Sequence, residues 1–368
     1  MKIESKKLNI PDVSVWEAVD ALTSLYVGAM DKGIPFAELP TPFLWGPPGV
    51  GKSEGIMECA DMIEERTGKK VFVRIVHLSY YTPQDINGLP VPNAKRDRTV
   101  YLRPEILDFD PSGGMINILF LDELSAAPLS TQIAAYQLCL NRAAGEHKLP
   151  DNTIVIAAGN RTTDRSIAYS MPKALANRLM HFNVSFSFPS WKDWALRNGI
   201  DRRIIGYLSF DQSRANTEPD AGDLAFTTPR SWTLASNSLK AVPDDCPYTG
   251  MYVSGCVGTD AALEFGEWCK VYSSLPSVSD IMHGRCSDYP TRQDVLFALS
   301  SSLEAALYTD RERVAPVTLE NVCAYVSRFP PDFAFTFFKD LNNIPELKTK
   351  MMACHSVQRW LSVNKKYL

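Results

Sequence analysis

A glycine- and proline-rich stretch of eight residues constrains this chain more than any other part of it. The stretch comprises Gly46, Pro47, Pro48, Gly49, Val50, Gly51, Lys52 and Ser53. It satisfies the pattern G-x-x-x-x-G-K-[ST], in which glycines allow backbone amides to close around phosphate groups. The apolar residues 43–45 before it predict a buried strand, and residues 52–68 after it predict a helix. Because a helix N-terminus attracts anions, this context predicts a phosphate-binding loop.

Two acidic residues, Asp122 and Glu123, end a second apolar run. A carboxylate at the end of a buried strand is costly unless a cation accompanies it. We therefore expect Asp122 and the Ser53 hydroxyl to hold Mg²⁺, while the Lys52 ammonium binds the β- and γ-phosphates of a nucleoside triphosphate. Glu123 would polarise the attacking water.

Three further polar residues follow apolar segments or begin helices. Asn160 ends the apolar run 154–159; it could cap the following turn, but we expect it to orient the attacking water beside Glu123. Arg178 and Arg230 could be solvated surface residues. We expect both instead to stabilise the charge that develops during phosphoryl transfer. Thr228 and Pro229 before Arg230 predict the start of a helix.

Strands alternate with helices up to about residue 190, which predicts a parallel five-stranded sheet covered by helices on both faces. From there the patterns favour helices only. We expect an N-terminal helix within residues 1–35, a nucleotide-binding core over residues 36–190, and a helical lid and C-terminal region over residues 191–368. Residues 80–112 are expected to be an insertion with its own small structure, because a structureless segment of that length is uncommon inside a compact domain. We expect a second insertion at residues 145–151, which have the pattern of a hairpin tip.

The overall composition is that of an ordinary globular chain. Its 368 residues are 45% hydrophobic and carry a net charge of −4, so no global basic field favours nucleic acid. The N-terminus has no apolar core of the signal-peptide type, and no apolar stretch reaches the roughly 18 residues that a membrane span needs. We therefore expect a cytoplasmic protein without a membrane span.

Taken together, the segments "LWGPPGVGKS", "ILFLDELSAAP", "IVIAAGN", "ALANRL" and "TPRSW" resemble the AAA+ ATPases, and within them the MoxR-like, dynein-related branch. The resemblance covers roughly residues 35–240, including a D-x-x-G element from Asp85 to Gly88. It implies a P-loop AAA+ αβα sandwich with a helical lid, and ATP hydrolysis with Mg²⁺.

The resemblance also implies a role for each candidate residue. Asn160 would be the first sensor, Arg178 the finger that reaches the ATP of the next subunit, and Arg230 the second sensor. The polar switch residue could be His77 or Ser79, and the sequence does not decide between them. Many members of the family have a proline after the asparagine, whereas this chain has Arg161. Arg161 and Arg165 could therefore compete with Arg178 for the finger role.

A site that is shared between subunits implies a homo-oligomer, usually a hexameric ring. The expected function is chaperone-like remodelling or maturation of a client or adaptor protein, and in this branch such a partner often carries a von Willebrand factor A domain. The alternative is an AAA+ motor or loader acting on nucleic acid, for example in a DNA-restricting or mobile-element complex. The basic residues in 93–98 are the best candidate contact for that alternative. The function of residues 250–368 stays open.

Overall fold

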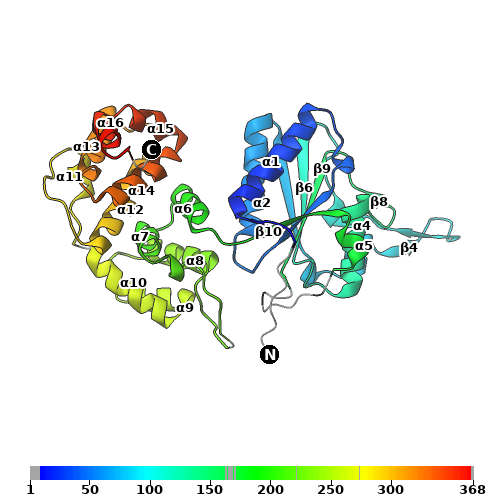
Figure 1. The fold of residues 1–368 in the computed structure, drawn as a ribbon. Coiled ribbons are helices and arrows are strands. Elements are labelled where there is room, and N and C mark those ends of the chain that lie inside the picture. Colours follow the sequence, from blue (N-terminus) through cyan, green and yellow to red (C-terminus); the bar gives the residue numbers. More distant parts are fainter. Residues whose placement is uncertain are drawn as a thin grey trace. The chain divides into compact units, whose positions relative to one another are not determined.

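The computed structural model describes residues 9–161, 164, 169, 171–220, 222–272 and 274–365. The chain divides into two compact units, Met1–Ser187 and Phe188–Leu368 (Figure 1). Each unit has its own hydrophobic core.

The first unit contains all strands of the described chain. Its elements are β1 (Asp12–Val13), α1 (Val15–Asp31), β2 (Thr41–Trp45), α2 (Lys52–Thr67), β3 (Lys70–His77), α3 (Pro83–Asn87), β4 (Pro90–Pro92), β5 (Thr99–Tyr101), β6 (Met115–Asp122), α4 (Leu129–Asn141), β7 (Ala143–Ala144), β8 (His147–Lys148), β9 (Thr153–Gly159), α5 (Lys173–Ala176) and β10 (Leu179–Val184). Six of these strands form one sheet in the order β1-β10-β2-β9-β6-β3, and all neighbours are parallel. The carboxyl ends of all six strands therefore lie at the same edge of the sheet.

Helices cover both faces of this sheet. Along β6, Ile116, Ile118 and Phe120 pack with residues of α1 and α2, whereas Leu119 and Leu121 point to the opposite face and pack with α4. This alternation follows from the two-residue period of a strand, and burial on both faces explains why the run is almost entirely apolar. The predicted fold class, a three-layer αβα core followed by a helical region, is confirmed.

The sheet has one strand more than the five predicted. The short β1 pairs with the end of β10, where Asp12 lies opposite Asn183 and Val13 opposite Val184. The backbone N–H of Ser185 donates to the Val13 carbonyl at 2.9 Å. A two-residue strand is too short to produce an alternating pattern in the sequence, so only pairing with β10 defines it.

The expected insertion 80–112 contains a small hairpin, and the expected insertion 145–151 overlaps a second one that begins earlier, at residue 143. β4 pairs with β5, and β7 pairs with β8, each antiparallel. The two hairpins meet, because the backbone N–H of Tyr101 donates to a carboxylate oxygen of Glu146 at 2.9 Å. Gly88 has a φ of +96°, and a Cβ there would lie 2.1 Å from the Leu102 carbonyl oxygen, so this position requires glycine.

The aspartate of the D-x-x-G element shapes the same region. Asp85 accepts hydrogen bonds from the backbone N–H and the hydroxyl of Thr82, at 2.8 and 2.7 Å. These bonds hold the pKa of Asp85 below its ordinary value and close a capping box at the start of α3. The element therefore has a structural role here, which is to start and to end the short helix.

The second unit is helical throughout its described part. Its helices are α6 (Phe188–Arg197), α7 (Arg202–Phe210), α8 (Pro229–Lys240), α9 (Thr249–Val257), α10 (Thr259–Tyr272), α11 (Val278–Met282), α12 (Gln293–Thr309), α13 (Pro316–Val326), α14 (Pro331–Asn342), α15 (Pro345–Met352) and α16 (His355–Val363). No helix in the described parts of either unit is long and apolar enough to cross a membrane.

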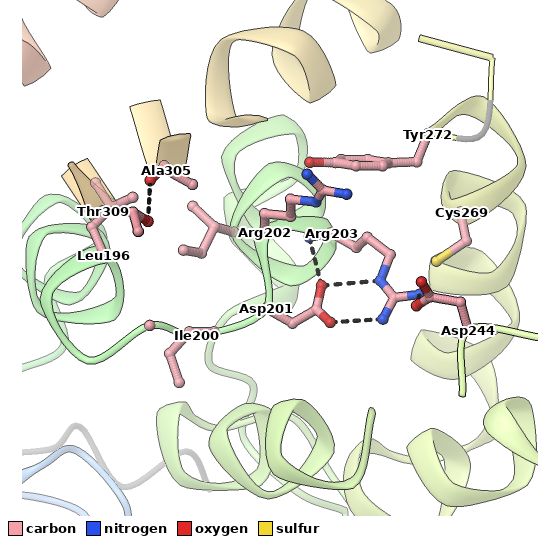
Figure 2. A pocket seen from close by; sticks show the side chains of 12 residues that line it. Leu196, Ile200, Asp201, Arg202, Arg203, Asp244, Cys269, Tyr272, Ala305 and Thr309 are labelled. Atoms are coloured by element: carbon pink, nitrogen blue, oxygen red, sulfur yellow. Dashed lines mark hydrogen bonds and ion pairs between the residues drawn. The ribbon is translucent and has the colours of Figure 1, made fainter. Parts of the chain in front are cut away.

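A cavity of about 610 Å³ lies in this unit beside the start of α7 (Figure 2). Arg203 forms a two-point ion pair with Asp201 there, with nitrogen–oxygen distances of 3.0 and 2.7 Å. The guanidinium of Arg202 lies 5.7 Å from the ring centre of Tyr272. Both arginines are thus held by neighbours within the unit.

An ionic group is buried where α6, α12 and α14 meet. The ammonium of Lys192 lies 2.8 Å from a carboxylate oxygen of Glu304 and 2.6 Å from one of Asp340. Burial raises the pKa of Glu304 to about 7, although the charge of Lys192 acts in the opposite direction. Burial disfavours the charged form of Lys192 as well, but the two carboxylates outweigh it and raise its pKa.

We predict that Lys192→Met destabilises the protein by about 3–5 kcal/mol at about pH 8.5, because the buried Glu304 and the partly buried Asp340 lose their cation. At about pH 6 the loss should be smaller. A carboxyl whose pKa is raised by folding favours the folded state at low pH and opposes it as the pH rises through that pKa. Urea unfolding at both pH values measures the difference.

Lys270→Met is the matched control, because Lys270 pairs with Glu267 on the surface, where both side chains are about three-quarters exposed. Its effect should stay below about 1 kcal/mol. An equal loss of stability for Lys192→Met at both pH values would contradict the prediction.

Candidate active site

The candidate phosphate-binding loop, residues 46–53, follows β2 and leads into α2, the strand and the helix that the sequence predicts on either side of it. Gly49 has a φ of +78° and Gly51 a φ of +102°, a region that favours glycine. Gly51 is the N-cap of α2, so the loop leads directly into a helix N-terminus that faces the edge where the strands end. The backbone therefore has the form that cradles phosphate groups.

The first glycine of the loop packs against the end of β10. A Cβ at Gly46 would lie 2.7 Å from the backbone carbonyl oxygen of Val184. The Gly46 N–H donates to the Gly159 carbonyl at 3.2 Å. Gly46 is therefore fixed between the ends of β10 and β9, with no room for a side chain.

Lys52 lies across the loop. Its ammonium donates to the carbonyl oxygens of Gly46 and Pro47, at 2.6 and 3.0 Å, and to the side-chain oxygen of Asn160, at 3.3 Å. Only 9% of the residue is exposed. The lysine and the asparagine, 108 positions apart in the sequence, thus meet at the loop.

Ser53 and Asp122 meet at the strand ends. The Ser53 hydroxyl donates to a carboxylate oxygen of Asp122 at 2.8 Å. Both groups offer oxygen ligands, which suit Mg²⁺, and this ion commonly takes one or two protein oxygens and completes its shell with substrate phosphates and water. The described residues contain no cluster of three or more His, Cys, Asp and Glu that could hold a metal by itself. The pair fits a Mg²⁺ ion that arrives with a nucleotide.

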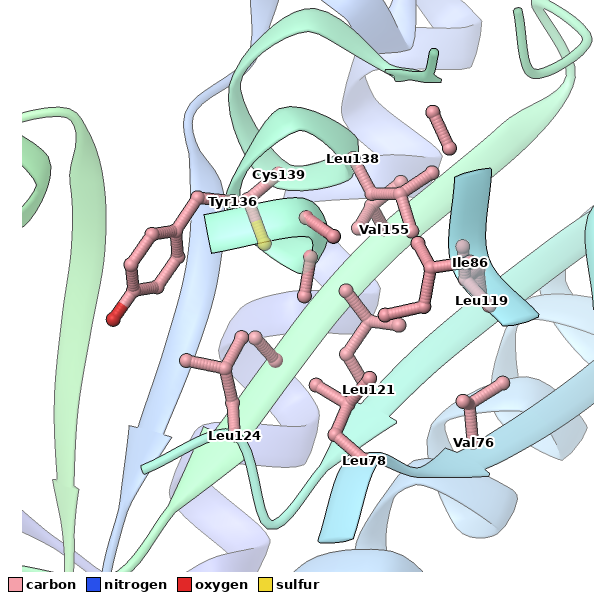
Figure 3. Close-up of a cluster of buried hydrophobic side chains, with 14 of the residues drawn as sticks. Val76, Leu78, Ile86, Leu119, Leu121, Leu124, Tyr136, Leu138, Cys139 and Val155 are labelled. Carbon is pink, nitrogen blue, oxygen red and sulfur yellow. The ribbon is translucent and has the colours of Figure 1, made fainter. Parts of the chain in front are cut away.

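Glu123 directly follows β6 in an unusual backbone conformation. Its φ is +57°, uncommon for a residue with a side chain. The turn is held by the Leu124 N–H, which donates to the Ala158 carbonyl at 2.9 Å. Leu121 and Leu124, on either side of the acidic pair, belong to the buried cluster between the sheet and α4 (Figure 3). Packing of the two leucines therefore fixes the backbone position from which the Glu123 side chain extends.

The two candidate switch residues have different partners. The Ser79 hydroxyl donates to a carboxylate oxygen of Glu123. The Nδ1 atom of His77 lies 3.8 Å from a carboxylate oxygen of Asp122, beyond hydrogen-bond distance. Of the two, Ser79 is the residue that holds Glu123, a choice that the sequence left open.

Asn160 is fixed through both its backbone and its side chain. Its carbonyl accepts a hydrogen bond from the Ser125 hydroxyl at 2.9 Å, and its amide oxygen accepts from Lys52. Sequence reasoning missed Ser125. A hydroxyl two positions after Glu123 is a common surface feature, and only the structure shows that it is buried at 3% exposure.

The structure places Arg178 away from this group. Arg178 precedes β10, whose first residue, Leu179, lies opposite Thr41 at the start of β2. The loop begins at the other end of β2, about 17 Å away at roughly 3.3 Å per strand residue. Arg178 is exposed and lies beside a cavity of about 400 Å³ at that opposite edge. It is therefore too far away to act on the nucleotide of its own subunit.

The remaining arginines differ in position. One guanidinium nitrogen of Arg161 donates to the Val184 carbonyl at 2.8 Å, at the same edge as the loop, so Arg161 is engaged within its own subunit. Arg165 lies outside the described residues. Arg230 is exposed on the first turn of α8, which begins at Pro229 with Thr228 as its cap. The predicted helix start before Arg230 is confirmed.

A histidine links the start of the loop to the segment that carries Arg178. The indole N–H of Trp45 donates to Nδ1 of His181 at 3.0 Å. Nε2 of His181 lies 2.8 Å from the Ala176 carbonyl, in α5. Because an indole only donates, Nδ1 must accept, and the ring proton on Nε2 is shared with Ala176. Nothing in the sequence marked His181 for this position.

We predict that Gly46→Ala lowers the affinity for ATP at least about tenfold, because the added Cβ meets a backbone oxygen and must displace the end of β2 or β10. Gly28→Ala in α1 is the control, since a Cβ there meets nothing within 4 Å. Equilibrium titration with a fluorescent ATP analogue measures both variants. Wild-type affinity in Gly46→Ala would show that this close packing is not needed for binding.

No family model matches the sequence. No curated protein matches it either. Among solved structures, the chain is similar to the ORC2 protein of Aeropyrum pernix in its ADPNP–ADP complexes, with 14% identity, a TM-score of 0.43, and coverage of 92% of this chain and 88% of that one. It is also similar to a RuvB mutant of Thermotoga maritima, with 16% identity, a TM-score of 0.39, and coverage of 80% and 86%. A third similar structure is NtrX of Brucella abortus in complex with ATP, with 14% identity, a TM-score of 0.36, and coverage of 95% and 67%. At such low identities and scores, conclusions about function rest on the residues of the site itself.

Proposed function

We propose that this protein is an AAA+ ATPase of the MoxR-like branch, which hydrolyses ATP with Mg²⁺ to remodel or mature a partner protein. One observation carries the proposal: the Lys52 ammonium, the Ser53–Asp122 pair, Glu123 and Asn160 lie together where β2, β6 and β9 end, beside the glycine loop. Each residue type is one that phosphoryl transfer to water needs.

Each residue has one task in this mechanism. The loop amides and Lys52 bind the phosphates of ATP and orient the γ-phosphate. Mg²⁺, held through Ser53 and Asp122, would neutralise charge that builds up on the phosphate oxygens. Glu123 accepts a proton from the attacking water, and the amide of Asn160 holds that water in line.

In this mechanism the hydrogen bond from Ser79 to Glu123 would restrain hydrolysis. While the Ser79 hydroxyl donates to Glu123, one carboxylate oxygen is occupied. A carboxylate acts as a general base only within hydrogen-bond reach of its water. Release from Ser79 would turn Glu123 toward the γ-phosphate, which gives Ser79 the role of the polar switch.

The position of Arg178 supports a site that two subunits complete. In its own subunit Arg178 lies at the edge opposite the loop, so its charge could stabilise transferring phosphate only in a neighbour. This requires a homo-oligomer, and we propose a closed, hexameric ring. Arg230 would contact the γ-phosphate as a residue of the lid.

The surface around the two hairpins is where we place the partner. Tyr80 is 82% exposed and Leu102 is 55% exposed, and Leu89 and Tyr101 are exposed beside them in sequence. The Glu146–Tyr101 hydrogen bond joins the two hairpins into one surface. Exposed aromatic and aliphatic side chains suit a protein partner, and in this branch a protein with a von Willebrand factor A domain is a natural candidate.

The nucleic-acid alternative rests on the basic tip of the β4–β5 hairpin. In that tip the backbone N–H of Asn93 donates to the Arg98 carbonyl at 3.0 Å, and the Asn93 side chain donates to Asp97 at 2.8 Å. These bonds explain the sequence of the tip as a turn. The side chains of Lys95, Arg96 and Arg98 are exposed on this turn, and a nucleic acid is therefore kept as the second candidate partner.

We predict that Glu123→Gln lowers kcat for ATP hydrolysis by about 10²–10⁴-fold while ATP affinity stays within about threefold, because only the base is removed. Phosphate release and equilibrium nucleotide titration measure the two quantities. Glu267→Gln is the control, as Glu267 is an exposed carboxylate of α10 in the second unit. If purified wild-type protein hydrolysed no ATP in any oligomeric state, the proposal would fail.

Arg178→Ala should stop hydrolysis without emptying the site, because the arginine would act on the ATP of a neighbour. Mixing Arg178→Ala with Glu123→Gln subunits should then restore activity. Where an Arg178→Ala subunit supplies the site and a Glu123→Gln subunit supplies the arginine, that interface has both an intact Glu123 and an intact Arg178. Steady-state hydrolysis at varied mixing ratios measures this. Activity that stays at the level of the separate variants would argue against a residue supplied in trans.

A further inference from the structure

The Ser125 hydroxyl joins the turn that carries Glu123 to the residue that would orient the water. Ser125 lies two positions after Glu123, and 3% of its surface is exposed. Its hydroxyl donates to the backbone carbonyl of Asn160 at 2.9 Å. The bond connects the turn after β6 with the end of β9.

The backbone around Ser125 is fixed independently of that bond. The preceding N–H, of Leu124, donates to the Ala158 carbonyl at 2.9 Å, and the N–H of Ala127 donates to the Glu123 carbonyl at 3.2 Å. The Ser125 carbonyl accepts from the N–H of Tyr169 at 2.8 Å. Ser125 therefore lies on a turn that other hydrogen bonds hold in place. Its hydroxyl acts on the other partner of the bond, Asn160, and positions that residue.

Gly159 shows how closely the two segments fit. A Cβ at this position would lie 2.6 Å from the Ser125 hydroxyl oxygen and 2.9 Å from the Ser125 Cβ. Real Cβ atoms do not approach other atoms so closely, so the serine occupies the space that a side chain at position 159 would need. Ser125 thus contacts the backbone immediately before Asn160 as well as the Asn160 carbonyl.

We propose that Ser125 is a positioning residue for ATP hydrolysis: by holding Asn160 at a fixed place relative to Glu123, it keeps the attacking water between the two side chains. The inference rests on the proposed function. The Ser125 hydroxyl donates to Asn160, at the end of β9, whereas Lys52 donates to the Gly46 and Pro47 carbonyls within the loop itself. Ser125 should therefore affect the rate of hydrolysis and leave nucleotide binding nearly unchanged.

Ser125→Ala tests this separation. Without the hydroxyl, the Asn160 carbonyl loses a partner and the end of β9 gains freedom, and small misplacements of reacting groups reduce rates strongly. We expect kcat to fall about tenfold, with KM and equilibrium ATP affinity within about threefold. A Ser125→Ala variant with wild-type kcat would overturn the inference, as would one that lost ATP affinity in proportion to kcat.

Ser209→Ala is the matched control for lost stability. Its hydroxyl also donates to a backbone carbonyl, that of Ile205, at 2.7 Å, and the residue is 8% exposed. Both variants remove one buried hydroxyl–carbonyl bond, so similar shifts of the thermal midpoint are expected. Only Ser125→Ala should lower kcat, and an equal loss of kcat in Ser209→Ala would reduce the effect to general destabilisation.

A double-mutant cycle with Asn160→Ala identifies the route by which Ser125 acts. Asn160→Ala removes the amide that orients water but keeps the backbone carbonyl that Ser125 binds. If Ser125 acts through that amide, adding Ser125→Ala to Asn160→Ala should lower kcat by less than about twofold. A further tenfold loss would show that Ser125 acts by another route and would overturn the inference.

The outcomes also separate this inference from the proposed function. A wild-type protein without ATP hydrolysis would overturn both. An active wild type, inactivated by Glu123→Gln but unaffected by Ser125→Ala, would overturn the role of Ser125 alone.

Discussion

The parallel pairing of β2, β9 and β6 is the constraint on which the rest of the site depends. Because these strands are neighbours and run in the same direction, residues that end each of them arrive at one edge. The Gly46–Gly159 and Leu124–Ala158 backbone bonds continue this pairing past the strand ends. The site is thus an extension of the sheet, and its loops have little freedom to rearrange independently.

Much of this arrangement could be predicted from the sequence, for physical reasons. A run of apolar residues that ends in Asp122 and Glu123 identifies a strand buried on both faces, and its polar end must lie at an edge. The glycine loop identifies its own backbone form, since left-handed φ values at Gly49 and Gly51 exclude most other residues. In these segments the residue pattern itself determines the local backbone conformation, so the conformation could be predicted from the sequence.

Contacts between segments that are far apart in the sequence could not be predicted from such local patterns. Whether Ser79 or His77 holds Glu123 depends on how the chain turns after β3, because both residues are polar and lie two positions apart. Ser125 and His181 have no distinctive neighbours in the sequence; their roles come from the packing of β9 and β10. The sixth strand was missed for a related reason, since two residues cannot show a period.

The bond from Trp45 to His181 has a consequence for how the two edges of the sheet communicate. The indole can only donate, so Nδ1 of His181 is the acceptor and the ring's N–H faces the Ala176 carbonyl. The two bonds fix the orientation of the imidazole, since turning the ring over would exchange its two nitrogens. The residue before the glycine loop and the segment that ends in Arg178 are therefore joined through one aromatic ring, and a displacement at one edge of the sheet reaches the other through it.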